Sequence, residues 1–113
     1  MRILNITSGE VIAENARIAD HFLTRLKGLI FTSHSDSLDC LVIGPCKMIH
    51  TFGMKFPLDI VFISHAGTVI RTIESLQPNR ISPFVGKASY VLELPPGMLE
   101  ISNTKCGDKI ALQ

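Results

Sequence analysis

The residues between positions 45 and 54 include most of the side chains in this chain that suit nucleophilic or metal chemistry. If this segment is extended as far as His50, the alternation of side chains along a strand places Cys46, Met48 and His50 on one face. A thiolate, a thioether and an imidazole together suit a soft metal such as Cu(I). The pattern therefore raises the hypothesis of a soft-metal site.

The spacing of these residues does not match the usual metal or nucleophile motifs. The chain has no CxxC pair and no HxxxH pair, and zinc sites favour four regularly spaced ligands. At roughly 3.3 Å per residue, Cys46 and His50 lie about 13 Å apart, too far for a thiol–imidazole hydrogen bond. Because cysteine and methionine are commonly buried, we expect core packing for Cys46 and Met48 and predict no metal and no cofactor. The alternative is a soft-metal site on Cys46 and His50, completed by Met54 or Cys40.

Two carboxylates lie within strongly apolar runs. Asp59 is inside FPLDIVFI and Glu93 is inside YVLEL. Burying an unpaired charge is very costly, so each carboxylate must reach a partner or solvent. For Asp59 we expect a strand-end ion pair, or a cap on loop N–H groups; the candidate cations are Arg25, Arg71 and Arg80. The functional alternative is that Asp59 and Glu93 meet in one cleft as an acid/base pair.

Short apolar runs separated by turn residues predict a mainly β (α+β) domain. Apolar residues at every fourth position from Ile18 predict an amphipathic helix over residues 16–27, with Asn15 as its N-cap and Gly28 as its C′ residue. A short second helix is expected over residues 98–103. The elements favour a compact antiparallel β-sandwich or partly closed barrel, with the helix on one face or end. The expected strands cover residues 2–6, 10–13, 40–43, 58–63, 68–76, 88–94 and 109–112.

Length and composition limit the class of protein. The chain has 113 residues, 46% of them hydrophobic and 19% charged, with a formal net charge of +1. This length corresponds to a single domain, residues 1–113. The near-neutral charge argues against binding nucleic acid or an anionic membrane through bulk electrostatics.

Location is also constrained by the sequence. No apolar run reaches the roughly 20 residues of a membrane span, and the first residues lack the apolar core of a signal peptide. An odd count of three cysteines argues against a secreted disulfide framework. We therefore expect a cytoplasmic protein with reduced thiols and no membrane span.

A longer pattern runs through the chain. IHTFGMKFPLDIVFI occupies residues 49–63, RLKGLI precedes it at 25–30, and VLELPPG follows it at 91–97. With these segments the chain resembles an uncharacterised prokaryotic family, domain of unknown function number 192, from about residue 15 to residue 112. The resemblance implies a compact, mainly β fold with a helix ahead of the Gly28–Leu29 step, and no known activity, cofactor or substrate. Many relatives carry Trp-Met-x-Asn-Thr where this chain has residues 50–54, so a Trp-based binding platform is not expected.

These features predict an uncharacterised small soluble β domain that is non-catalytic and binds a small molecule or a protein partner. Ordered loops on rigid scaffolds tend to carry function, so we expect the site where the 50–57 loop meets the helix end at 25–29. The alternatives are a small hydrolase or isomerase that uses Asp59, Glu93 and His50, and a soft-metal protein that uses Cys46 and His50. No nucleic-acid partner is expected. The predicted ligand-binding residues are Arg25, His50, Thr51, Met54 and Asp59.

Overall fold

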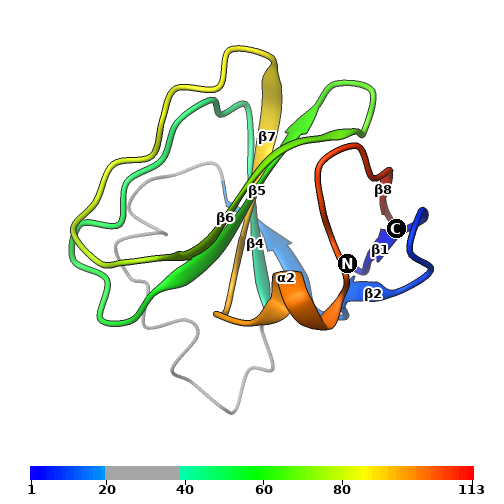
Figure 1. The fold of residues 1–113 in the computed structure, drawn as a ribbon, viewed down its shortest axis with the longest axis horizontal. Coiled ribbons are helices and arrows are strands. Elements are labelled where there is room, and N and C mark those ends of the chain that lie inside the picture. The colour runs from blue at the N-terminus through cyan, green and yellow to red at the C-terminus, as the bar shows by residue number, and fades with distance from the viewer. Residues whose placement is uncertain (20–38) are drawn as a thin grey trace.

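Strands dominate the regular structure of this protein. The computed structural model describes residues 1–19 and 39–113 (Figure 1). The elements within these ranges are β1 (Ile3–Asn5), β2 (Val11–Ala13), β3 (Ala16–Ile18), β4 (Cys40–Ile43), β5 (Leu58–Ser64), β6 (Val69–Leu76), β7 (Ala88–Leu94), α2 (Met98–Ile101) and β8 (Ile110–Leu112).

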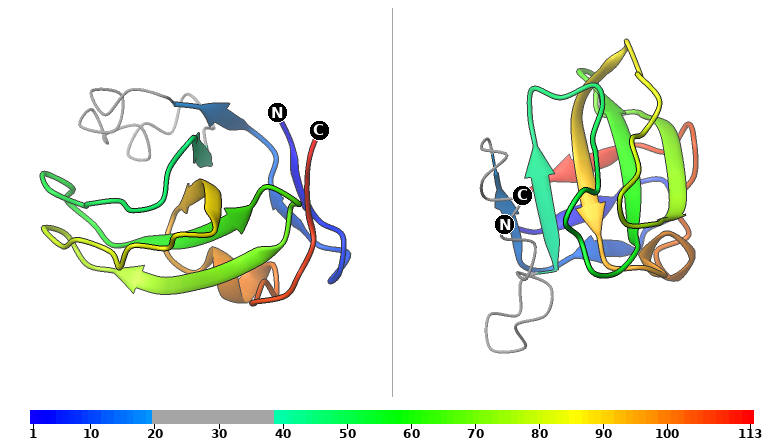
Figure 2. Two further views of the ribbon diagram at one scale, coloured as in Figure 1. Left: turned by 90° about the horizontal axis from the view of Figure 1, so that it is seen from above. Right: turned by 90° about the vertical axis from the view of Figure 1, so that its left-hand side faces the viewer.

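The described strands form two sheets. One has five strands in the order β3-β4-β7-β5-β6, and the other has three in the order β2-β1-β8. The larger sheet is curved, and the smaller one lies at the end of the molecule that carries both termini (Figure 2). Within the described residues, every strand pair is antiparallel except β3 and β4, which run parallel. The predicted mainly β class is confirmed, with this one parallel pair as an exception to the antiparallel expectation.

The predicted helix over residues 16–27 is wrong at its start. Ala16–Ile18 forms strand β3, with Ala16 opposite Cys40 and Ile18 opposite Val42. The backbone N–H of Ala19 continues the pairing by donating to the Val42 carbonyl at 2.8 Å. Pairing with a distant strand has therefore overridden the local four-residue spacing. Residues 20–27 lie outside the described residues, whereas the second predicted helix is confirmed as α2 over Met98–Ile101.

Strand β5 divides the core into two parts because its side chains alternate between the faces of the sheet. Val61 and Ile63 pack in the cluster between the two sheets, with Leu99 of α2 beside them. Ile60 and Phe62 point to the other face and pack beneath the loops. Six consecutive residues from Leu58 are buried, which confirms the predicted strand with two covered faces.

The loops at 44–57 and 77–87 run side by side at the end of the larger sheet away from the termini (Figures 1 and 2). His50 and Ile81 form an isolated antiparallel bridge. The Ser82 N–H donates to the Ile49 carbonyl at 2.9 Å, and the Val85 N–H donates to the Lys47 carbonyl at 2.8 Å. The two loops thus form a hydrogen-bonded ribbon, which we call the loop end.

Asn5 provides a test of how the small sheet is fixed to the C-terminal turn. Its buried amide donates to Thr104 Oγ1 at 3.0 Å and to Asp108 Oδ2 at 2.9 Å, and its oxygen accepts the Ser8 N–H at 3.0 Å. Asn5→Ala leaves these buried groups unsatisfied, so we expect a loss of about 2–4 kcal/mol in the free energy of unfolding by urea titration. The exposed control Asn15→Ala is expected to change it by less than about 0.5 kcal/mol. Equal effects of the two variants would contradict the assignment.

Candidate functional site

Thr51 is the residue that joins the two loops. It is fully buried, and its hydroxyl donates to the Gln77 carbonyl at 2.6 Å while accepting the Arg80 N–H at 2.9 Å. Its own N–H donates to the Arg80 carbonyl at 2.8 Å, and its carbonyl accepts the N–H groups of Asn79 and Met54. Main-chain and side-chain bonds together make Thr51 the anchor of the loop end.

His50 lies next to this anchor on the outer side of the ribbon. Its half-buried ring stacks on Phe52, with ring centroids 4.9 Å apart and an interplanar angle of 26°. The Phe52 N–H donates to His50 Nδ1 at 3.2 Å. Since Nδ1 is the acceptor, the ring proton of the neutral imidazole resides on Nε2.

Met54 and Asp59 both lie in the interior, on different faces of the sheet. Met54 is 9% exposed and packs with Leu58 and Ile60 beneath the loop end. Asp59 alternates with Ile60 and therefore points to the opposite face, toward α2. Of the five residues predicted to bind ligand, His50, Thr51 and Met54 are brought together at the loop end. Arg25 lies outside the described residues.

The Asp59 carboxylate caps two loops. Oδ1 accepts the Ser75 N–H at 2.9 Å, and Oδ2 accepts the N–H groups of Gly97 and Leu99 at 3.0 and 2.9 Å. Gly97 is the N-cap residue of α2 and has no side chain of its own to cap it, so Asp59 performs the capping from another element. The expected cap on N–H groups is confirmed, and neither Arg71 nor Arg80 is the partner that holds this carboxylate.

The sheet register separates Asp59 from Glu93. Asp59 is opposite Leu94, and Glu93 is opposite Ile60. Neighbouring residues of a strand point to opposite faces, so the two carboxylates lie on different sides of the sheet. The predicted alternative of an acid/base pair formed by Asp59 and Glu93 is therefore wrong. Because Asp59 is paired with Leu94 and not with Glu93, the two carboxylates cannot meet in one cleft.

The three cysteines occupy different environments, and none is in a disulfide. Cys40 is fully buried in the core between the sheets, as is expected of a packing residue. The half-buried Cys46 thiol donates to the Met48 carbonyl at 3.2 Å. Within residues 1–19 and 39–113, no three His, Cys, Asp or Glu side chains gather in a way that holds a metal ion.

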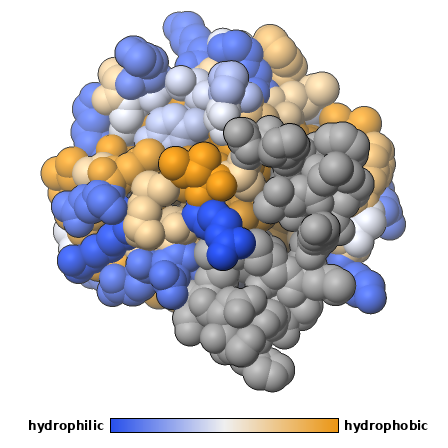
Figure 3. Space-filling model, turned by 180° about the vertical axis from the view of Figure 1, so that it is seen from behind, coloured by the Kyte–Doolittle hydropathy of each residue, from blue (hydrophilic) through white to orange (hydrophobic). Residues whose placement is uncertain are grey.

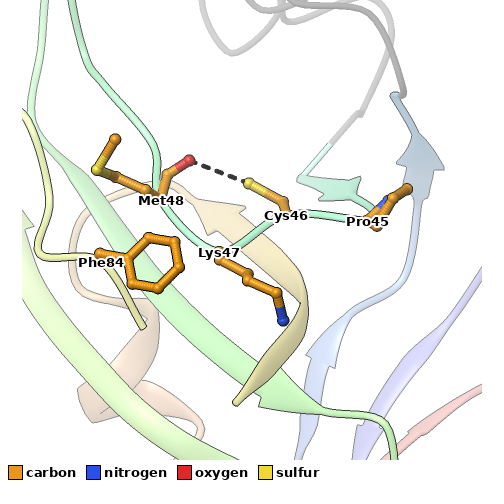
Figure 4. A pocket seen from close by; sticks show the side chains of 5 residues that line it. All are labelled: Pro45, Cys46, Lys47, Met48 and Phe84. Atoms are coloured by element: carbon orange, nitrogen blue, oxygen red, sulfur yellow. Dashed lines mark hydrogen bonds between the residues drawn. The ribbon is translucent and has the colours of Figure 1, made fainter. Parts of the chain in front are cut away.

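A cleft with a volume of about 430 Å³ opens on the loop end (Figure 4). Its lining is mostly apolar and comes from Met48 on one loop and Phe84 on the other, together with Pro45 and Cys46. Lys47 also lines it, and its ammonium donates to the carbonyls of Gly86 and Ala88, both at 2.7 Å. Sequence reasoning missed Phe84; the available signal was a large apolar residue inside a Pro- and Gly-rich connection.

The two loops carry four exposed apolar side chains, of which Met48 and Phe84 line the cleft. The exposed fractions are 50% for Met48, 46% for Phe52, 60% for Ile81 and 68% for Phe84. Alternation along the first loop turns Ile49 and Thr51 inward, so Met48 and Phe52 lie on the outer face of the ribbon. The face of the molecule behind that of Figure 1 shows a broken apolar band with polar side chains above and below it (Figure 3).

The two sheets, the short helix capped by Asp59 and the paired loops define a small, mainly β domain with a preformed surface cleft. Its described part contains no helix long and apolar enough to cross a membrane. The chain matches the DUF192 family, described as uncharacterized ACR, over residues 3–112, and it belongs to this family. The resemblance seen in the sequence is thereby confirmed.

Relatives agree with this assignment, and a solved structure shares the fold. A UPF0127 protein of Pyrococcus horikoshii is 32% identical over 97 residues, which cover 83% of this chain and 84% of that protein. A UPF0127 protein of Thermococcus sibiricus is 29% identical over 112 residues, or 96% of this chain and 72% of that protein. The crystal structure of a protein of unknown function from Novosphingobium aromaticivorans has a TM-score of 0.77 and 24% identity, covering 99% of this chain and 84% of that one. The structural likeness shows a shared fold.

Replacing Asp59 by Asn tests the cap directly. The side chain keeps its size, but one carboxylate oxygen is replaced by an NH₂ group. This group is a donor, so it cannot accept the hydrogen bonds that the main-chain N–H groups donated to the carboxylate. We expect Asp59→Asn to lower the free energy of unfolding by about 2–3 kcal/mol in urea titration, since buried donors lose their acceptor. Asp39→Asn is the matched control, because Asp39 accepts the N–H groups of Glu14 and Asn15 near solvent. A loss as large at Asp39 as at Asp59 would contradict the role of burial.

Thiol labelling tests the cysteine environments. Burial, with smaller contributions from Asp39 and Glu93, raises the pKa of the Cys40 thiol. Because the thiolate is the reactive form, Cys40 should stay unlabelled in the native protein even at alkaline pH, and react only on unfolding. Cys106 is exposed and should react first, followed by Cys46. Mass spectrometry of peptides from partially labelled protein gives the order, and native labelling of Cys40 at the rate of Cys106 would overturn it.

Proposed function

We propose that this protein is a non-catalytic binding module whose loop end accepts an apolar group of a small molecule or of a protein partner. The observation that carries the proposal is the apolar cleft of about 430 Å³ between Met48 and Phe84. Ligand pockets typically measure about 300–1,000 Å³ and are lined mainly by apolar side chains. Met48 adds an adaptable surface, because its unbranched thioether side chain conforms to different shapes.

The way the loop end is held supports binding. Thr51 fixes one loop to the other through its hydroxyl, and Ile49 is tied to Ser82 by both main-chain and side-chain bonds. The ammonium of Lys47 secures the end of the second loop through Gly86 and Ala88. A preorganised site loses little conformational entropy when it binds, so more of the contact free energy contributes to affinity.

The ligand-binding residues predicted from the sequence have different roles in this proposal. His50, stacked on Phe52, stands at the edge of the binding surface and contacts the ligand. Thr51 and Met54 act as positioning residues beneath it. Asp59 fixes the strand from which the loop departs, and Arg25 would contribute from outside the described residues.

Methyl NMR tests the cleft, because the chain has only four methionines. In protein labelled with [methyl-¹³C]methionine, the neutral fragments indole and naphthol should shift the Met48 methyl resonance. Met54 is buried beneath the loops, and Met98 is the first residue of α2 and packs against the core between the sheets, so their resonances should stay in place. Dose-dependent movement of Met48 alone is the expected result.

The matched variants are Phe84→Ser and Ile101→Ser, since both wild-type side chains are 68% exposed. Removing Phe84 takes away one wall of the cleft and should weaken fragment binding at least about ten-fold, which corresponds to about 1.4 kcal/mol. Ile101→Ser should leave it unchanged. If neither fragment moves Met48, or if both variants bind as the parent does, the proposed site is wrong.

A further inference from the structure

The charge of this chain is unevenly distributed. The two loops, residues 44–57 and 77–87, hold Lys47, Lys55, Arg80 and Lys87 and contain no Asp or Glu. The remaining residues hold seven Lys and Arg against ten Asp and Glu. The net charge of +1 therefore combines a cationic loop end with a body that has an excess of carboxylates.

The cations share the loop end with its exposed apolar side chains. Met48, Phe52, Ile81 and Phe84 are each about half exposed or more. They project from loops that hydrogen bonds hold together, at the end of the molecule away from both termini. Large exposed apolar patches rimmed by polar residues mark contact with a protein or a membrane.

We propose that the loop end docks on the surface of an anionic lipid bilayer. The apolar side chains would enter the boundary between headgroups and acyl chains, and the lysines would face the lipid phosphates. Each Lys or Arg near such a surface contributes about five-fold to partitioning, equivalent to about 1 kcal/mol. The carboxylate-rich body then points away from the anionic surface.

The residue types at the loop end favour an anionic bilayer over an acidic protein or a nucleic acid as the partner. Protein interfaces are depleted in lysine, and three of the four loop cations are lysines. Single-stranded nucleic acid is bound by stacking of its bases on aromatic rings. Met48 and Ile81 have no ring and cannot take part in such stacking. Docking uses the same end as the proposed cleft but depends on the lysines and on bilayer insertion, so fragment binding and membrane binding can fail independently.

Vesicle sedimentation tests the inference with the full chain. Vesicles of phosphatidylcholine and phosphatidylglycerol in equal amounts should bind the protein at low ionic strength, and binding should fall as salt screens the charges. Vesicles of phosphatidylcholine alone should bind at least about ten-fold less. Absence of binding to the anionic vesicles, or equal binding to both kinds, would overturn the proposal.

Two pairs of variants separate local from overall charge. Lys55→Gln with Lys87→Gln should lower the partition coefficient by about twenty-five-fold, at five-fold for each lysine. Lys105→Gln with Lys109→Gln makes the same change in net charge near the termini and should have less than about a two-fold effect. Equal losses in the two pairs would show that only net charge matters and would refute a docking face.

The apolar contribution is measured separately. Phe84→Ser should reduce binding to anionic vesicles at least about ten-fold, because a phenyl ring no longer enters the bilayer. Ile101→Ser is again the control with the same exposed fraction. Unchanged binding of Phe84→Ser would exclude insertion of this loop.

Discussion

The buried carboxylate of Asp59 is the constraint around which this fold is arranged. A charge within a fully covered strand is tolerated only if nearby donors replace water. Here Ser75, Gly97 and Leu99 supply three N–H groups from two separate segments. Two of these residues, Ser75 and Gly97, have positive φ angles of 52° and 96°. The carboxylate therefore helps to offset the cost of left-handed backbone at Ser75, whereas Gly97 adopts its positive φ without a steric penalty.

Fixing the end of β6 also fixes the loop that follows it. Ser75 is bound by Asp59, and two residues later the Gln77 carbonyl is bound by Thr51. The segment between β6 and β7 is thus held where it begins by Asp59 of strand β5 and by Thr51 of the other loop. Beyond this point Ile81 and Phe84 are exposed on the surface.

The sequence was a good guide wherever local pattern determined the structure. The continuous apolar run of β5 and the alternation in β7 predicted the two central strands, and the cost of burying Asp59 predicted its cap. The start of the expected helix, Ala16–Ile18, is a strand instead because it pairs with β4, a contact across more than twenty residues. The separation of Asp59 from Glu93 depends on the register between β5 and β7. That register is set by how the two strands pair, and the sequence of one strand alone does not specify it.

The distribution of polar groups supports the proposal that this surface binds a partner. The loop end contains no carboxylate, and His50 uses Nδ1 to accept a main-chain N–H. The internal carboxylates of Asp59 and Asp108 accept main-chain or amide hydrogens that fix the fold. General acid–base catalysis needs positioned groups that exchange protons with a substrate. At the loop end the exposed side chains are instead mostly apolar, cationic or amide-bearing, with Phe84, Lys55 and Asn79 as examples. The proposed binding therefore rests on desolvation and positive charge.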